Sequence, residues 1–509
     1  MHPVSGTNGA APEHVDVLIL GAGLSGIGAA CHLQRECPQK TYAILEARES
    51  IGGTWDLFRY PGIRSDSDMF TLGYVFRPWK APESIADGAS ILRYINDTAS
   101  EHGVQRRIRF GQRAVRAEWS SENARWTVHA RDERTGEMRL LTCSFLFACT
   151  GYYRYDEGYC PRFEGAERFG GEIVHPQHWP QDLDAAGKRV VVIGSGATAV
   201  TLVPALAREG AQVTMLQRSP SYILSIPGQD PLALALSRRL DAARVYSIVR
   251  WKNVVMSGLV YRLCRRFPTR MAKLIRGIAS KQLPLDFEID KHLVPRYKPC
   301  DQRLCLVPDG DLFKAISGGN ASIVTDEIKS FTERGIELAS GAELEADVIV
   351  TATGLNLLLL GGMTFSVDGA ELDLGESVAY KGMMLCGVPN AAFTIGYTNA
   401  SWTLKADLVA QYVCRLVRTM DERGAAICTP QAPASGAPTE PIIDLQSGYV
   451  LRVIDTLPKQ GHVAPWRLHQ NYFRDLRLLR HGPVDDAMAF SSPRARQEPS
   501  VAEDELVAA

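Results

Sequence analysis

The chain has 509 residues and a formal net charge of -1, with 45% hydrophobic and 22% charged residues. These ordinary proportions exclude a disordered chain, a fibrous repeat and a small disulfide-stabilised domain. The near-zero net charge gives no reason to expect a nucleic-acid partner. The length predicts two or three domains around a large core.

Targeting signals and membrane spans are not expected. The first six residues are polar, so we predict no signal peptide. No run of about 18 apolar residues occurs, which predicts no membrane-spanning helix. The 11 cysteines are scattered without a zinc-like double pair, so we expect reduced thiols in a cytoplasmic protein and no metal site.

The first glycine-rich turn lies between two predicted strands. An apolar strand at residues 15–20 leads into Gly21-Ala22-Gly23-Leu24-Ser25-Gly26, and a helix at 27–35 and a strand at 40–45 follow. This is the dinucleotide-binding pattern, and Glu46 supplies the acid at its end. We expect Gly21, Gly23, Ser25 and Gly26 to form the phosphate-binding turn, and Glu46 to accept hydrogen bonds from a ribose diol.

A second turn of the same kind follows later in the chain. A strand at 189–193 leads into Gly194-Ser195-Gly196-Ala197-Thr198-Ala199, then a helix and a strand at 212–216. The second strand ends in Arg218 and Ser219 instead of an acid. An arginine and a hydroxyl favour a 2'-phosphate, whereas an acid repels it. We therefore predict NADP at the second site and an adenine dinucleotide without that phosphate at the first.

Two dinucleotide sites in one chain indicate a flavoprotein that a nicotinamide reduces. Strands at 145–149 and 346–351 both end in a small-residue turn, at Gly151 and Gly354. We interpret both turns as crossings between two nucleotide domains, with backbone close to cofactor.

Further motifs carry a family resemblance. Phe169, Gly171, His175 and Trp179 fit the pattern FxGxxxHxxxW just before the second turn. Together with the runs 52–55 and 59–66, they resemble the type I Baeyer–Villiger monooxygenases. The runs 58–68 and 398–407 are similar to a mycobacterial branch of that family.

The resemblance implies a reaction. NADPH reduces FAD, the reduced flavin and dioxygen form a C4a-peroxyflavin, and this species converts ketones into esters or lactones. The same oxidant can oxidise the sulfur of thioethers or thioamides. The expected partners are therefore a small ketone or sulfur compound and dioxygen.

The resemblance also implies site residues. It assigns Thr54, Trp55, Asp56, Leu57 and Ala114 to FAD. It places Arg64, Ser65 and Asp66 at the nicotinamide end, and makes Arg303 and Asp66 the catalytic pair. A fixed cation suits an anionic oxidant, and arginine stays charged where lysine need not. Gln302 stands where many members have a lysine, so NADP selection depends more on Arg218 and Ser219. His175 and Trp179 are expected to brace a linker, because no further metal ligand accompanies them.

The expected fold class is α/β, with two dinucleotide-binding domains and a helical insertion. The FAD domain takes residues 1–151 and 355–490, and the NADP domain takes 152–221 and 300–354. The insertion takes 222–299, and the tail 491–509 is expected to be disordered.

The insertion is strongly basic. Residues 231–283 contain 12 basic residues and one acid, Asp241, interspersed with apolar side chains. One interpretation is an amphipathic cap over the substrate pocket, with its bases in water. The alternative is peripheral contact with an anionic membrane.

Three other functions remain open at this point. A pyridine nucleotide–disulfide reductase has two such domains, but its redox cysteines follow soon after the first turn, whereas Cys300 and Cys305 lie far downstream. An N- or S-oxidising flavin-containing monooxygenase shares most of the chemistry. A flavoprotein redox sensor or a membrane-associated adaptor would not turn over NADPH.

Overall fold

The computed structural model describes residues 12–302, 304–443, 445 and 447–493. The larger of its two main sheets has nine strands, and its parallel part is built around β1 (Glu13–Leu20). β1 pairs in parallel with β2 (Tyr42–Leu45) on one side and β6 (Met138–Ala148) on the other. The inner part of β1 is apolar on both faces because helices and strands cover both sides of the sheet.

The edges of this sheet come from distant segments of the chain. β3 (Ile108–Arg109) pairs with β2, and β23 (Ala391–Phe393) pairs with β6. An antiparallel extension contains β4 (Gln112–Ser120), β5 (Arg125–Asp132), β19 (Thr364–Val367) and β20 (Ala370–Glu371). Helices α1 (Leu24–Glu36) and α11 (Trp402–Glu422) pack together in the core on one face. One sheet therefore combines strands from an early and a late segment of the chain.

The second sheet is entirely parallel, in the order β13-β10-β9-β17-β8. Its strands are β8 (Glu172–Val174), β9 (Arg189–Ile193), β10 (Gln212–Gln217), β13 (Ala321–Thr325) and β17 (Val348–Thr351). Helices α5 (Ala197–Arg208) and α10 (Asp311–Ser317) pack on it. The parallel part of the first sheet and the wholly parallel second sheet confirm the expected α/β fold class.

Two linkers cross between the sheets and pair with each other. β7 (Tyr153–Gly158) and β18 (Leu355–Leu357) form an antiparallel ribbon. They follow the turns at Gly151 and Gly354 that the sequence singled out as crossings.

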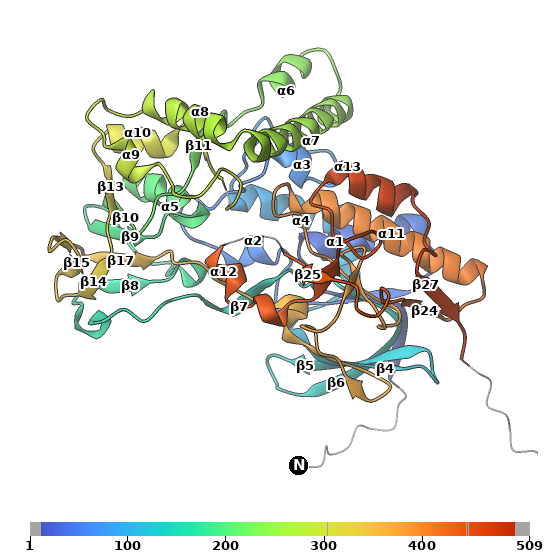
Figure 1. The fold of residues 1–509 in the computed structure, drawn as a ribbon. Coiled ribbons are helices and arrows are strands. Elements are labelled where there is room, and N and C mark those ends of the chain that lie inside the picture. Colours follow the sequence, from blue (N-terminus) through green and yellow to red (C-terminus); the bar gives the residue numbers. More distant parts are fainter. Residues whose placement is uncertain (1–11, 303, 444, 446, 494–509) are drawn as a thin grey trace, which may run out of the picture.

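The helical insertion lies along one edge of the molecule (Figure 1). It contains α6 (Pro231–Leu236), α7 (Ala242–Arg266), α8 (Pro268–Ser280) and α9 (Ile289–His292). It leaves and rejoins the NADP half through the parallel pair β11 (Ile223–Ile226) and β12 (Cys305–Pro308). Among the described residues, no helix has the length and apolarity that a membrane crossing requires.

Smaller elements complete the fold. They are α2 (Thr54–Leu57), α3 (Met69–Leu72), α4 (Gly88–Glu101), α12 (Gly448–Leu451), α13 (Tyr472–Asp475), β14 (Ile328–Phe331), β15 (Gly335–Leu338), β16 (Glu343–Glu345), β21 (Ala379–Tyr380), β22 (Met384–Leu385), β24 (Ile427–Pro430), β25 (Thr439–Pro441), β26 (Lys459–Gly461) and β27 (Met488–Ser491). β27 pairs with β24 through Ser491, so the first residue of the expected tail belongs to a strand. The rest of that tail from 494 lies outside the described residues.

A buried arginine holds the insertion against the FAD half. Arg250 of α7 donates hydrogen bonds of 2.8 Å to the carbonyls of Phe70 and Gly73, and its guanidinium lies 3.6 Å from Asp407. Asp407 also accepts a hydrogen bond from the Val75 N–H. A buried charge with this many partners fixes the position of α7 as long as all partners stay in place.

Replacing Arg250 with methionine should lower the Tm by at least about 5 °C, because the buried carbonyls and Asp407 lose their cationic partner. Differential scanning calorimetry measures the change. Arg262→Met, on the exposed side of the same helix, is the matched control. A Tm for Arg250→Met equal to that of the control would show that Arg250 does not anchor α7.

Candidate functional site

Both glycine-rich turns open on one cavity of about 440 Å³. Gly21, Gly23 and Ser25 of the first turn line it, and so do Ala197 and Thr198 of the second. The turns follow the carboxyl ends of β1 and β9, which is where open α/β sheets bind nucleotides. The two predicted nucleotide sites therefore meet in one place.

The first turn needs glycine for packing as well as for ligand access. Gly21 has a φ of +99°, and a Cβ there would lie 2.7 Å from the carbonyl oxygen of Cys149. A Cβ at Gly26 would lie 1.8 Å from the carbonyl oxygen of Gly21. Gly26 thus lets α1 begin directly against the turn, while Gly23 presents its backbone to the cavity.

Glu46 is a buried carboxylate on the cavity wall. It accepts hydrogen bonds from the N–H of Ala22 at 2.7 Å and of Arg48 at 2.9 Å, and burial raises its pKa. Ala114 and Gln112 line the same cavity. A carboxylate fixed by two N–H groups beside the glycine turn suits the ribose of an adenine nucleotide, and this role of Glu46 stays a prediction from the sequence.

The segment 54–57 divides between two places. The resemblance assigns all four residues to FAD. Thr54 and Trp55 line the cavity, whereas Asp56 and Leu57 line a neighbouring hollow. The Asp56 carboxylate lies 2.6 Å from guanidinium nitrogens of both Arg48 and Arg59. Burial opposes ionisation of Asp56, but hydrogen bonds from Ser50 and Arg48 outweigh it and lower the pKa. Arg48 lines the cavity, and Asp56 fixes its guanidinium through their ion pair.

The loop 58–66 joins the two halves of the protein. A Cβ at Gly62 would lie 2.7 Å from the Cβ of Ala205, so the loop packs directly on α5. Arg64 donates two hydrogen bonds to Asp311 at the start of α10. Arg64, Ser65 and Asp66 all line the cavity that both nucleotide turns also line. Their position at the nicotinamide end stays a prediction from the sequence resemblance.

The second turn repeats the packing of the first. Gly194 has a φ of +135°, and a Cβ there would lie 2.4 Å from the carbonyl oxygen of Ala352. Ser195 donates a hydrogen bond to the Ser219 carbonyl at 3.1 Å, which joins the turn to the end of β10. A Cβ at Gly196 would meet no described atom within 4 Å, so the backbone there is open to a ligand. Ala199 is buried under the turn and Gly196 is exposed.

Arg218 is exposed at the end of β10, with Ser219 beside it. Within the part of the chain that the structure describes, the Arg218 guanidinium forms no ion pair or hydrogen bond. Such a cation beside a nucleotide turn suits a phosphate at the 2'-position of the adenosine ribose.

Arg303 lies outside the described residues. Three residues later, Leu306 lines the cavity, and two residues earlier, Asp301 pairs with Arg265 of α7 at 2.8 Å. The role of Arg303 consequently stays a prediction from the sequence resemblance.

The FxGxxxHxxxW segment packs against the linker ribbon. A Cβ at Gly158 would lie 1.9 Å from the His175 ring, so the imidazole rests on bare backbone of β7. Gln177 donates hydrogen bonds to two further carbonyls of β7, at 3.0 and 2.9 Å. Burial lowers the pKa of His175, which keeps the ring neutral. Trp179 packs on the core of the NADP half.

Phe169 and Gly171 of the same motif fix the chain that leads to His175. Phe169 is buried in a small core on one face of the second sheet. A Cβ at Gly171 would lie 2.3 Å from the Asp347 carbonyl oxygen, so the strand entering β8 needs glycine there.

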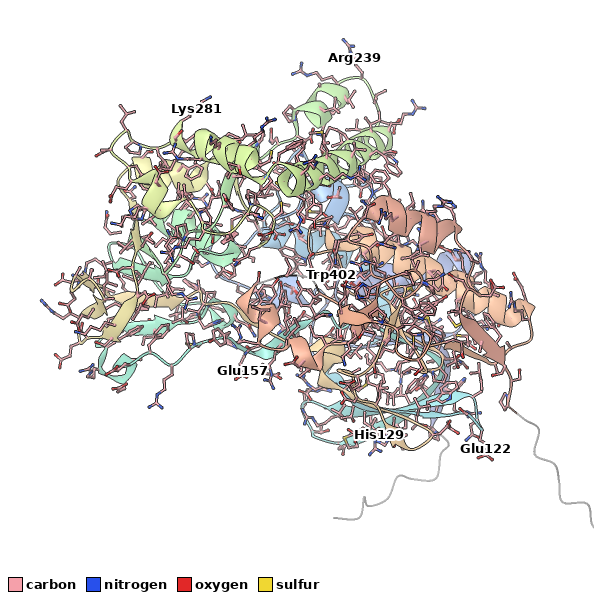
Figure 2. The ribbon with its side chains drawn as sticks, viewed as in Figure 1. Glu122, His129, Glu157, Arg239, Lys281 and Trp402 are labelled. Carbon is pink, nitrogen blue, oxygen red and sulfur yellow. The ribbon has the colours of Figure 1, made fainter. Side chains whose placement is uncertain are left out.

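Trp402 is a cavity residue that sequence reasoning did not assign. Its indole N–H donates to the Ser25 hydroxyl at 2.7 Å, and its ring stacks on Tyr152 with centroids 5.0 Å apart. It lies near the centre of the molecule (Figure 2). Trp402 lies in the run 398–407, which carries part of the family resemblance, and this run was the only sequence feature that could have indicated its place in the site. Tyr397, another cavity residue, bonds to Asp475 at 2.7 Å.

The cysteines do not form the redox pair of a disulfide reductase. Cys305 is buried and donates to the Ser195 carbonyl at 3.8 Å, whereas Cys300 lies against Cys264 of α7. The described residues also contain no group of three His, Cys, Asp or Glu side chains arranged to hold a metal ion.

Comparison with known proteins identifies the family. Residues 78–360 match the flavin-binding monooxygenase-like family, and residues 19–78 match an NAD(P)-binding Rossmann-like domain. The chain therefore belongs to the flavin-binding monooxygenase-like family.

The most similar curated relatives include mycobacterial enzymes. The FAD-containing monooxygenase EthA of Mycobacterium tuberculosis (strain ATCC 25618 / H37Rv) is 57% identical over 475 residues, which is 93% of this chain and 97% of that protein. EthA of Mycolicibacterium smegmatis (strain ATCC 700084 / mc(2)155) is 54% identical over 485 residues, covering 95% and 98%.

Solved structures share the fold at low identity. A cyclohexanone monooxygenase from Rhodococcus sp. Phi1 bound to NADP+ has a TM-score of 0.76 and 19% identity, covering 95% of this chain and all of that one. A steroid monooxygenase bound to NADP has a TM-score of 0.72 and 23% identity, covering 94% and 100%. These findings confirm the predicted family resemblance and the expectation of FAD and NADP as cofactors.

Replacing Glu46 with alanine should weaken FAD binding about tenfold, because the ribose loses a charged acceptor. Titration of the apoprotein with FAD, followed by flavin fluorescence, measures the Kd. Glu49→Ala, an exposed acid three residues away, should leave it unchanged. Equal Kd values for the two variants would remove Glu46 from the FAD site.

Replacing Arg218 with alanine should raise the KM for NADPH about tenfold or more, because the 2'-phosphate loses its cation. The KM for NADH should stay constant, so NADH serves as the internal control. Steady-state oxidation of both cofactors gives the two values. A parallel rise for NADH would mean that Arg218 acts through the turn itself and not through the phosphate.

Proposed function

We propose that the chain is a Baeyer–Villiger monooxygenase, which uses NADPH and dioxygen to convert ketones into esters or lactones. The observation that carries the proposal is that two nucleotide turns line one cavity, together with Arg64 and Asp66. A cofactor that donates hydride and one that activates oxygen would then meet beside the same substrate space. The proposal includes oxidation of sulfur in thioethers or thioamides, and it accords with a cytoplasmic location.

The residues of the chain have separate roles in this proposal. The glycine turns and Glu46 hold the flavin nucleotide, and Arg218 and Ser219 select the phosphate of NADPH. Bound FAD supplies the chemistry with dioxygen once NADPH has reduced it. Trp402, Tyr152 and the leucines of the cavity wall keep water away from the reacting atoms.

In this proposal, Arg303 is the charged residue that stabilises the anion formed in the reaction, and Asp66 pairs with it. An oxygen-transfer reaction that passes through an anion needs a cation that cannot release its proton. The sequence resemblance assigns that cation to Arg303, and Asp66 on the cavity wall is its assigned partner. A cation stabilises the developing negative charge without taking part in bond making.

The alternative within the same family is an N- or S-oxidising flavin monooxygenase. The ketone preference is supported by Trp179 at the end of the fingerprint, by the match at Arg303, and by the fold shared with a cyclohexanone monooxygenase and a steroid monooxygenase. A non-enzymatic redox sensor would oxidise negligible NADPH in air, with or without ketones.

Product analysis separates these alternatives. Linear, aryl and cyclic ketones and a thioether would each be incubated with the holoenzyme and NADPH. Esters from at least one ketone are expected. Sulfoxide from the thioether with no ester from any ketone would replace the proposal by the S-oxidising alternative.

Arg303→Ala should reduce ester formation at least about 100-fold while NADPH still reduces the flavin, because the substitution removes only the cation at the reacting atoms. Stopped-flow absorbance follows flavin reduction, and chromatography follows the ester. Arg303→Lys, which keeps a charge, should retain more activity than the alanine variant. Normal ester yield from Arg303→Ala would refute the assigned role.

A further inference from the structure

Helix α7 has an apolar stripe on its outer face. Ile248, Trp251, Val255 and Leu259 are 44–49% exposed, although each is a large hydrophobic side chain. At about 100° per residue they fall within an arc of about 80°. A contiguous exposed stripe of this kind marks an interaction surface more often than scattered single residues do.

Arginines stand at both ends of this stripe. Arg244 precedes it by one turn, and Arg262 and Arg266 follow it, all in the same arc of the helix. At the junction with α8, Phe267 is 40% exposed, and Arg266 and Arg270 lie 5.3 and 5.6 Å from its ring centroid. The surface therefore has an apolar centre and cationic margins.

The basic residues of the insertion are largely unneutralised. Of the 12 in residues 231–283, Arg244, Arg250, Lys252, Arg265 and Arg276 form ion pairs. The other seven are exposed and have no acidic partner among the described residues: Arg238, Arg239, Arg262, Arg266, Arg270, Lys273 and Lys281. Arg239 and Lys281 project from the outer edge of the molecule (Figure 2).

The inner face of α7 is already occupied. Val254 packs against Tyr397 and Leu404, and Arg250 is bonded to the FAD half. An amphipathic cap over the substrate pocket accounts for this inner face, because Val254 packs on Tyr397 and Tyr397 lines the cavity. Trp251 also stacks on Phe473 of α13, with ring centroids 6.3 Å apart, yet it stays 44% exposed. The cap interpretation leaves the exposed part of the stripe unexplained, so this part needs an occupant of its own.

The unpaired bases favour an anionic lipid surface over a second copy of the chain as the partner of this stripe. A second copy of the chain docked by a two-fold axis would place these unpaired bases against one another, which costs energy. An anionic lipid surface complements them, and its interface accommodates tryptophan and aliphatic side chains between arginines that reach the headgroups.

We propose that the outer face of α7 and the α7–α8 junction form a docking surface for an anionic membrane. The apolar stripe enters the headgroup region, and the unpaired bases beside it, Arg262, Arg266 and Arg270, contact lipid phosphates. The enzyme attaches without crossing the bilayer, and the attachment weakens as salt increases.

Co-sedimentation of the holoenzyme with vesicles tests this proposal. Vesicles of about 30% phosphatidylglycerol in phosphatidylcholine, in about 20 mM NaCl, should bind the protein, and pure phosphatidylcholine vesicles should not. Arg262→Gln/Arg266→Gln/Arg270→Gln should weaken binding at least about tenfold. Trp251→Ser/Leu259→Ser should also weaken it, because the stripe loses its largest apolar groups.

The matched control is Arg116→Gln/Arg125→Gln/Arg139→Gln, which removes the same charge from β4, β5 and β6 at the opposite end of the molecule (Figure 1). It should bind vesicles like the wild-type protein. Bound flavin and NADPH oxidation should be normal in all three variants. No sedimentation of the wild-type holoenzyme at low salt, or equal loss in the control, would overturn the proposal. So would a vesicle-free oligomer that Trp251→Ser/Leu259→Ser dissociates, since the stripe would then join copies of the chain.

Discussion

The whole arrangement depends on how closely two glycine turns approach neighbouring strand ends. Gly21 packs on the Cys149 carbonyl and Gly194 on the Ala352 carbonyl, with room for no side chain at either place. Each of these strand ends then continues into a linker, so the contact that forms a nucleotide site also sets where the chain crosses to the other half. This shared geometry brings two nucleotide sites to one cavity. A Cβ at either glycine would move the phosphate-binding backbone and the domain crossing together.

The contacts between the halves come from short loops, not from the sheets. The loop at Gly62 packs on α5, Arg64 bonds to Asp311, and the His175 segment packs on β7. The insertion leaves the NADP half but is anchored by Arg250 to the FAD half. Cofactor geometry thus depends on a few polar and close-packed contacts between segments far apart in sequence.

Much of the fold was predictable because local pattern determines it. Strand, glycine turn, helix and a final Glu46 or Arg218 specify a βαβ unit and its nucleotide within about 30 residues. The segment 54–57 was harder. Family resemblance assigned all four residues to FAD, but the structure turns Asp56 toward Arg48 and Arg59, away from the cavity. Whether a side chain faces a cavity or supports one from behind depends on neighbours that no local pattern encodes.

Trp402 and the stripe on α7 are two further features that local sequence pattern does not encode. Trp402 meets Ser25 only because α11 returns to the first sheet some 377 positions later in the chain. The basic composition of the insertion was visible in the sequence, but whether its apolar residues faced the pocket or solvent was not. Only the packing of Val254 and the exposure of Trp251 distinguish the two faces.

The central claim is that one cavity joins hydride delivery from NADPH to oxygen delivery to a ketone. Isotope incorporation tests it most directly, with the holoenzyme turning over a ketone under ¹⁸O₂. We predict that the ester contains one labelled oxygen atom and that one NADPH is consumed per ester formed. Consumption of NADPH with hydrogen peroxide as the only oxygen product, and no label in any organic product, would contradict the account.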